Sequence, residues 1–520
     1  MRGDFRGRGK GTKAPPTNKW SWSLILLLVV ELFVAGRRLA YDEPTAPPAW
    51  QSMRTATAQL LADDAGQPFR FLSMSDMGYD PGDLADLEAM YGQCLSPEAV
   101  YNLIVVTKMK EVLAFNLPLR YRIASVDGYD GGLLPVARYV TLEKLFLAED
   151  EIWPDGRLRQ QLRRVPEARL LSLLNVKYVI TDKTQDVWID GVYYDLEHTV
   201  PLGRLALNEL PAFKADRLGV VSYLTGTAEL TDGTPVARAV ITGTEGTVVS
   251  HTLRAGEHTA EGRYDDGPVA HGPARVGHRW RDEAGGNDYV ALLDLGGPFQ
   301  PQTIAIESLL PGRAFHLRGL TLVDAGSGTN RYLSIDPDYK LVHSGDVKVY
   351  ENEAVLPRAF AVQSARVAAG DEAALEMLRD PAFDPAREVV LADGRPLAPG
   401  GQVAQAEIVA YNAEEVRLEV ALDAPGYVVL TDAYYPGWVA EIDGRPAAIV
   451  RANIYFRAVA VGGGRHQVVF RYRPAGVRWG LAISLGALAV WLAGAAILAL
   501  HGQGGQMEGS RIGRKRPSSV

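Results

Sequence analysis

The sequence predicts a β-rich α+β protein that is anchored to a membrane. Three observations predict this fold class. An apolar segment lies near each end, a mixed pattern of helices and strands follows the first, and short alternating runs separated by Gly, Asp and Pro fill the second half. At 520 residues the chain is long enough for roughly two to four domains, each with its own core.

The apolar segment near the C-terminus is the stronger of the two. Trp479–Leu500 carries no charged residue, and a helix of this length is about 33 Å long, enough to span the hydrocarbon core. We therefore expect a transmembrane helix over 477–500. Small residues recur four positions apart in it, as at Ala482 and Gly486, and this spacing allows close approach of a second helix or is merely tolerated in lipid.

The N-terminal segment, 20–36, is shorter and contains Glu31. A carboxylate costs about 2.5–3.5 kcal/mol at the centre of a spanning helix and less near an interface. A retained transmembrane anchor is the favoured interpretation. A cleaved signal peptide remains the alternative, because a basic start and the small residues Ala35 and Gly36 frame the apolar core.

The two tails, 1–19 and 501–520, are basic. The formal net charge of the chain is −8; the tails together carry +8, which leaves −16 on the residues between them. The positive-inside rule then places both tails in the cytoplasm and the rest outside the cytoplasmic membrane. An acidic centre argues against nucleic-acid binding, so the lipid bilayer is the expected partner.

Residues 37–217 alternate between helical and strand patterns, so we expect a mixed α/β extracytoplasmic domain. An arginine-rich stretch that includes Arg159, Arg163, Arg164 and Arg169 is typical of a solvated helix face, or of one that meets lipid headgroups.

Residues 218–346 read as an inserted β-sandwich or jelly roll, because short alternating runs are interrupted about every ten residues. Such modules often bind carbohydrate through exposed aromatic, amide and carboxylate side chains. The candidate ligand-binding residues are Trp280, Arg281, Asp288 and Tyr289. The alternative is that Trp280 covers the core.

Residues 347–476 predict a second β-sandwich with one helix at Asp371–Asp380. Pro436-Gly437 has the order of a type II turn, and Asp443-Gly444 predicts a hairpin. Tyr434, Tyr435 and Trp438 flank the first turn and either cover the sandwich end or form a sugar platform.

The last two strands of this region, on either side of Gly462–Gly464, are expected to form a hairpin. Only 474–477 separates the second of them from the membrane helix, which would hold the sandwich against the bilayer.

No motif predicts chemistry. The sequence contains no GxSxG, HExxH or phosphate-binding loop, and the adjacent Asp265 and Asp266 would point to opposite faces of a strand. We therefore assign no catalytic residue, no metal ligand and no cofactor, and we expect no catalysis by this chain alone.

Several stretches resemble the C-terminal extracytoplasmic part of the YfhO family of bacterial membrane proteins. They include "VDGYDG" at Val126–Gly131, "LLNVKYVITD" at Leu173–Asp182, "VKVYENEAVLPRAF" at Val347–Phe360 and "YYPGWVAEIDGRPA" at Tyr434–Ala447. The resemblance covers most of 20–215 and 346–500, and the sandwich at 218–346 is not part of it. Within it, Tyr129 and Asp130 are candidates for contact with an acceptor or partner, although a turn-forming role is the favoured interpretation of Asp130.

The family resembles C-type glycosyltransferases, which use polyprenyl-phosphate sugar donors. The resemblance implies a many-spanning membrane domain with an acidic catalytic residue, which precedes the matched region and has no counterpart in this sequence. The first hypothesis is thus that this chain is a non-catalytic accessory protein of such an enzyme, or its detached C-terminal part, and acts in cell-envelope glycosylation. Its expected partner is a multi-spanning glycosyltransferase subunit. The alternative is a stand-alone envelope glycan-binding protein.

Overall fold

A computed structural model describes most of the chain. The described residues are 19–37, 44–62, 66–75, 77–128, 134–208, 210–244, 246–280, 285–312, 314–398 and 404–508. They fall into two compact units, which are described separately below: one comprises residues up to Arg54 together with Asp80–Lys110, and the other comprises Thr55–Tyr79 and the chain from Glu111 onward. Of the basic tails predicted at 1–19 and 501–520, residues 1–18 and 509–520 lie outside the described residues.

The first unit is helical. A small core forms where Ala46, Ala49 and Leu103 are buried, and Arg54 ties the end of this unit to Asp83 through an ion pair of 2.8 Å. Pro47 starts one of its helices, because proline fits the first turn without the loss of a hydrogen bond. Its helices are α1 (Lys19–Gly36), α2 (Pro47–Gln51), α4 (Leu84–Tyr91) and α5 (Pro97–Glu111).

The second unit begins with a mixed sheet in the order β16-β17-β3-β1-β2. Its strands are β1 (Arg70–Ser73), β2 (Ala124–Ser125), β3 (Val176–Thr181), β16 (Tyr339–Ser344) and β17 (Lys348–Asn352). Strands β1, β2 and β3 run parallel, and β17 joins β3 antiparallel. The chain thus leaves this sheet after β3 and returns to it at the edge strand β16, from which β17 turns back to pair with β3. The intervening β-domain is therefore an insertion between β3 and β16.

Short helices accompany this sheet. They are α3 (Thr55–Leu61), α6 (Pro118–Tyr121), α7 (Ala137–Glu143), α8 (Leu158–Gln161) and α9 (Ala168–Leu173), with a 3₁₀ turn at Glu149–Glu151. Two of them, α7 and α9, share the core of the sheet. Helices and strands thus alternate in this part of the chain, but the arginine-rich stretch is not a continuous solvated helix. Its Arg159 is buried, with a side chain only 3% exposed.

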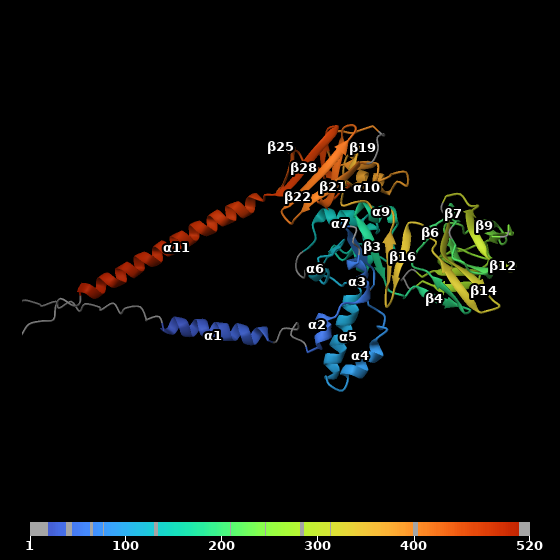
Figure 1. The fold of residues 1–520 in the computed structure, drawn as a ribbon, viewed down its shortest axis with the longest axis horizontal. Coiled ribbons are helices and arrows are strands. Elements are labelled where there is room, and N and C mark those ends of the chain that lie inside the picture. The colour runs from blue at the N-terminus through green and yellow to red at the C-terminus, as the bar shows by residue number, and fades with distance from the viewer. Residues whose placement is uncertain are drawn as a thin grey trace, which may run out of the picture. The chain divides into compact units, whose positions relative to one another are not determined.

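The insertion is a two-layer β-sandwich (Figure 1). One layer has the order β11-β12-β8-β14-β15 and the other β10-β9-β13-β7, and apolar side chains of both layers form one core. Strand β6 (Val200–Pro201) also pairs with β14. The layers are built from β7 (Arg204–Leu207), β8 (Ala215–Leu224), β9 (Pro235–Gly243), β10 (Val248–Arg254), β11 (Val276–Arg279), β12 (Asn287–Phe299), β13 (Pro301–Ser308), β14 (Phe315–Asp324) and β15 (Thr329–Leu333).

A hairpin of β4 (Asp186–Ile189) and β5 (Val192–Asp195) lies between the first sheet and the sandwich in sequence. Tyr194 of this hairpin packs against Gly219 of β8 so closely that a Cβ atom there would clash with its hydroxyl. Glycine at 219 is therefore required by packing rather than by backbone conformation.

The C-terminal part is a second sandwich whose strands form one continuous path of eleven. Facing side chains such as Leu430, Val459, Leu418 and Phe470 share a core. The strands are β18 (Ala359–Val362), β19 (Ser364–Val367), β20 (Glu388–Leu391), β21 (Ala404–Tyr411), β22 (Glu415–Leu422), β23 (Gly426–Ala433), β24 (Trp438–Ile442), β25 (Arg445–Ala447), β26 (Val450–Ala452), β27 (Phe456–Val461) and β28 (Gly464–Tyr472).

Local turn chemistry in this sandwich agrees with the sequence. Helix α10 (Asp371–Arg379) occupies the predicted position. Asp443 and Gly444 both have positive φ and join β24 to β25, as a type I′ hairpin requires. Gly437 has φ of 100°, which fits the predicted type II turn.

The predicted hairpin around Gly462–Gly464 is wrong. β27 pairs with β23 and β26, whereas β28 pairs with β22 and β24. The glycines therefore carry the chain from one layer of the sandwich to the other, and alternation alone could not distinguish this corner from a hairpin because both need a tight turn.

After β28 the chain enters α11 (Ala475–Glu508), which is labelled in Figure 1. Among the described helices, one segment is long and apolar enough to cross a membrane, at Ala475–Ile497. The shorter apolar stretch Leu26–Gly36 lies in α1.

Candidate functional site

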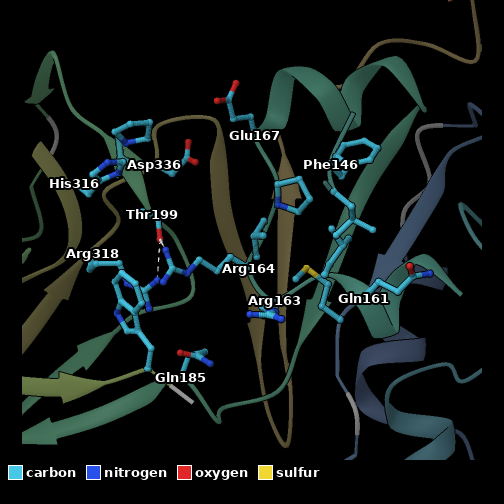
Figure 2. A pocket seen from close by; sticks show the side chains of 18 of the residues that line it. Phe146, Gln161, Arg163, Arg164, Glu167, Gln185, Thr199, His316, Arg318 and Asp336 are labelled. Carbon is cyan, nitrogen blue, oxygen red and sulfur yellow. Dashed lines mark hydrogen bonds between the residues drawn. The ribbon is translucent and has the colours of Figure 1, made fainter. Parts of the chain in front are cut away.

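A cleft of about 1650 Å³ opens between the sandwich and the loops that follow α7 and α8 (Figure 2). We refer to it as the central cleft; it is lined by segments 146–147, 159–169, 199–201, 223–225, 261–263, 278–280, 316–318 and 336–338, among others. In Figure 2, Arg164, Arg318 and Thr199 lie close together on one side, and Phe146 and Gln161 lie on the other.

The register of β8 and β14 creates the aromatic wall of the cleft. Tyr223 and His316 are directly opposite each other in the ladder, and their rings stack with a centroid distance of 4.6 Å and an interplanar angle of 2°. A register shift follows between Leu317 and Gly319, so Arg318 lies at a β-bulge. Bulges change the direction of a side chain, and here Arg318 is buried to 1% exposure at the cleft.

Arg164, from the loop after α8, packs onto this wall. Its guanidinium lies 4.8 Å from the ring centroid of Trp280 and donates to the Tyr223 hydroxyl at 3.0 Å. Both Arg164 and Arg318 also donate to Thr199 Oγ1, at 3.4 and 2.8 Å. Trp280 and Tyr223 themselves meet edge to face at 4.9 Å. These contacts fix two cations and two aromatic rings in one place.

Gly262 makes room for both rings. A Cβ atom at this position would lie 2.8 Å from Tyr223 and 2.9 Å from Trp280. A larger residue there would therefore displace the aromatic wall.

A buried carboxylate, Asp288, lies behind the aromatic wall and contacts Arg318. Asp288 is fully buried; its Oδ2 lies 3.0 Å from His278 Nδ1, which faces it across the β11–β12 ladder, and its Oδ1 lies 3.7 Å from Arg318 Nε. Burial alone would raise the pKa of Asp288, but Arg318 and His278 hold that pKa below its usual value. Asp288 is therefore ionised and partly neutralises Arg318.

Two further groups set the charge of the cleft. Burial, reinforced by Arg164, lowers the pKa of His316 to about 4, so its ring is neutral at neutral pH. Burial and the neighbouring carboxylates Asp338 and Glu167 raise the pKa of Asp336 to about 6. Six arginines and six acidic residues line the cleft, so its formal charges balance. Such a lining suits a polar ligand with many hydroxyl groups better than a polyanion.

The structure places the predicted sandwich residues at different depths. Trp280 lines the cleft, whereas Asp288 and Tyr289 are fully buried behind it. The Tyr289 hydroxyl donates to the carbonyl oxygen of Glu261 at 2.9 Å, so it is occupied within the fold. Arg281, Tyr129 and Asp130 lie outside the described residues, although Asp127 of the same motif is buried.

The predicted aromatic residues of the C-terminal sandwich gather near a second, smaller pocket of about 330 Å³. Tyr435 and Trp438 line it together with Asp432, Arg457 and Tyr472. Tyr434 is not among its lining residues, and its ring instead lies 5.4 Å from the guanidinium of Arg138.

Sequence reasoning missed Tyr223, His316, Arg164 and Arg318 as a group. They come from three distant segments, and only strand register and the bulge bring them together. The arginine pair Arg163-Arg164 after a short helix is the one local signal, and it was attributed to a solvated face. Among the described residues, no group of three or more His, Cys, Asp or Glu could hold a metal ion.

Comparison with known families matches the C-terminal part of the chain. Residues 401–484 match the YfhO family, described as bacterial membrane protein YfhO. We call these residues the YfhO segment. It runs from β21 through β28 and into the apolar stretch of α11, so a membrane-protein family and the one span-length helix coincide. The chain is thus a membrane-associated protein with a YfhO-type C-terminal region.

Solved structures give only distant likenesses. Arabinofuranosyltransferase AftD from mycobacteria is 12% identical, with a TM-score of 0.14, over 60% of this chain and 25% of that one. A mutant of the same enzyme is 14% identical, with a TM-score of 0.15, over 65% of this chain and 27% of that one. This chain thus spans about a quarter of their length, and such low scores establish neither a shared fold nor a shared activity. No curated protein matches.

Proposed function

We propose that this protein is a non-catalytic, membrane-anchored accessory protein, or the detached C-terminal part, of a C-type glycosyltransferase in cell-envelope glycosylation. The observation that carries the proposal is the YfhO segment, whose last strand, β28, is followed after two residues by the span-length helix α11. The resemblance of the YfhO family to such enzymes supplies the reaction. The accessory role follows from the expectation that a separate multi-spanning subunit carries the catalytic residue.

In this proposal α1 and α11 both cross the cytoplasmic membrane, and the two basic tails are cytoplasmic. The acidic bulk of the chain is then extracytoplasmic, where envelope polymers are assembled. The charge of the tails supports this orientation through the positive-inside rule.

Purification in mild detergent tests the accessory role. We expect the full chain to retain a multi-spanning glycosyltransferase subunit. The double variant Ala482→Leu and Gly486→Leu should reduce recovery of that subunit severalfold, because the larger side chains would block close approach of a second helix. The exchange Leu481→Ile on the same helix is the matched control. Recovery of the chain without any multi-spanning protein would contradict the proposal.

A second function, envelope glycan binding, is favoured by the central cleft. Trp280 offers an aromatic surface that buried Tyr223 supports, and Arg164, Thr199 and Asp336 offer hydrogen-bonding groups around it. An aromatic wall with a few convergent polar groups is the usual construction of a small-molecule or saccharide site.

Glycan-array binding by the full chain tests this second function. We expect Trp280→Ala to lower affinity about tenfold or more, because the mutation removes the ring and frees Arg164 from its packing, a loss of about 1.4 kcal/mol or more. Trp188→Ala is the matched control, since Trp188 is 68% exposed and lies outside the cleft lining. Equal glycan binding by the two variants would exclude the cleft as the glycan site.

A further inference from the structure

Three arginines from distant parts of the chain converge on one carboxylate in the C-terminal sandwich. Arg70 of β1, Arg358 before β18 and Arg457 of β27 lie 3.4, 2.8 and 3.0 Å from the carboxylate oxygens of Asp432. We call these four residues the arginine cluster. Among the described residues, Asp432 is the one carboxylate that forms an ion pair with any of the three.

The cluster therefore holds two positive charges in excess, and it holds them away from water. The side chains of Arg70, Arg358 and Arg457 are 13%, 8% and 2% exposed. Buried charge is costly unless it is paired. Binding of a further anion next to the three arginines would offset this excess positive charge.

Some of the guanidinium hydrogens in the cluster have no acceptor. Nε and Nη1 of Arg457 and Nη1 of Arg358 are buried and make no hydrogen bond within the described part of the chain. Buried donors in folded proteins are almost always satisfied, so donors left open beside a pocket point to a ligand.

The second pocket lies against this cluster. Arg457 and Asp432 line it, Tyr435, Trp438 and Tyr472 form aromatic walls, and its volume of about 330 Å³ is sufficient for a phosphate with its substituents. The Arg457 guanidinium is held flat against Trp438, 3.7 Å from the ring centroid. Tyr435 is 48% exposed, so the pocket is accessible from solvent.

The pocket is also next to the membrane helix in sequence. Tyr472 ends β28, and α11 starts at Ala475, so at most about 10 Å of chain separates them. The N–H of Arg473 donates to the carbonyl oxygen of Gly437 at 2.7 Å, which fixes the turn between Tyr435 and Trp438 to this connection. Tyrosine and tryptophan are enriched where proteins meet lipid headgroups.

We propose that this pocket binds the phosphate of an anionic phospholipid headgroup from the leaflet that α11 enters. Arg457, assisted by Arg358 and Arg70, supplies the positive charge, and Tyr435 and Trp438 form the walls. The inference needs membrane association but neither a glycosyltransferase partner nor glycan binding, so it stands or falls separately from the proposed function.

Native mass spectrometry of the full chain, purified in uncharged detergent, tests the proposal. With phosphatidylglycerol and phosphatidylcholine offered at equal concentration, we expect preferential retention of phosphatidylglycerol. Arg457→Gln should weaken this retention about tenfold, the effect of one charge-assisted contact. Arg417→Gln removes a charge from β22 in the other layer of the sandwich, where the side chain is 50% exposed, and should leave retention unchanged.

Two further variants keep the test decisive if Arg457→Gln fails to fold. Tyr435→Ala alters an exposed wall and should weaken retention severalfold, whereas Arg457→Lys keeps the charge and should retain part of the affinity.

Competition by inorganic phosphate would show that the phosphate group itself is recognised; no competition would assign recognition to the whole headgroup. Equal retention of the two lipids, or equal retention by Arg457→Lys, Tyr435→Ala and Arg417→Gln, would overturn the proposal.

Discussion

Replacement of Asp127 by asparagine is expected to lower the free energy of unfolding by about 3–5 kcal/mol. Asp127 is fully buried at its side chain and lies 3.0 Å from Arg159 Nη2, whose side chain is 3% exposed. The carboxylate also accepts the backbone N–H of Arg159 at 3.0 Å and the hydroxyl of Ser125 at 2.9 Å. Asparagine keeps the shape but leaves the guanidinium charge unpaired in the interior.

Thermal or urea unfolding of the full chain in detergent would measure this loss. Asp384→Asn is the matched control, because its partner Arg387 forms an exposed ion pair at 3.3 Å, worth at most about 1 kcal/mol. Similar losses in the two variants would show that burial does not set the value of the Asp127 pair. The same result would also mean that the ion pair with Asp127 does not explain why Arg159, within the arginine-rich stretch, is buried.

Lys348→Met is expected to be similarly damaging at neutral pH, by about 3–5 kcal/mol, and to be partly rescued by acid. Lys348 is 1% exposed, and its Nζ lies 2.5 Å from Asp186 and 3.0 Å from Asp195. Without the ammonium group, two buried carboxylates lose their cation. At lower pH they take up protons, so the difference between variant and wild type should shrink.

Glu197 gives the wild-type protein a pH dependence at the same place. Burial raises the pKa of Glu197 to about 8, and Asp195, Asp182 and Asp186 add to the rise while Lys348 opposes it. The folded state therefore binds a proton that the unfolded state releases near pH 4.5. The stability from this group is complete below pH 4.5 and is lost as pH rises through 8.

Unfolding midpoints measured between pH 5 and 8 would separate these effects. The gap between Lys348→Met and wild type should be smallest at pH 5, and the double variant Lys348→Met with Asp195→Asn should recover part of the loss at pH 7. A gap that stays constant with pH would mean that packing of the lysine stem, rather than charge, dominates.

The sequence was most informative where structure is local. Asp443-Gly444 predicted a hairpin because a type I′ turn needs positive φ at both residues, and α10 was predicted from the residues of its own segment. Trp280 was singled out as a large aromatic residue in a turn-rich module, and it does line the central cleft. The glycan-binding role of that residue stays a prediction.

What could not be predicted depends on pairing between distant segments. Strand β28 reads the same whether it pairs with β27 or with β22, and only the layer arrangement decides. Likewise, an arginine such as Arg457 shows no sign in sequence that it will meet Arg70 across the chain, because β1 and β27 are nearly four hundred residues apart. Charged side chains that the sequence pattern assigns to a solvent-exposed face can therefore be buried in the assembled sheets.

The position of β28 has a mechanical consequence. This strand is hydrogen-bonded on both sides, over eight registered positions to β22 and five to β24, and it leads into α11 after only two residues. A force transmitted by the helix would pull along the strand and load these perpendicular bonds together, in shear, rather than one after another as in unzipping. The attachment between body and anchor would thus resist tension far better than a terminal edge strand.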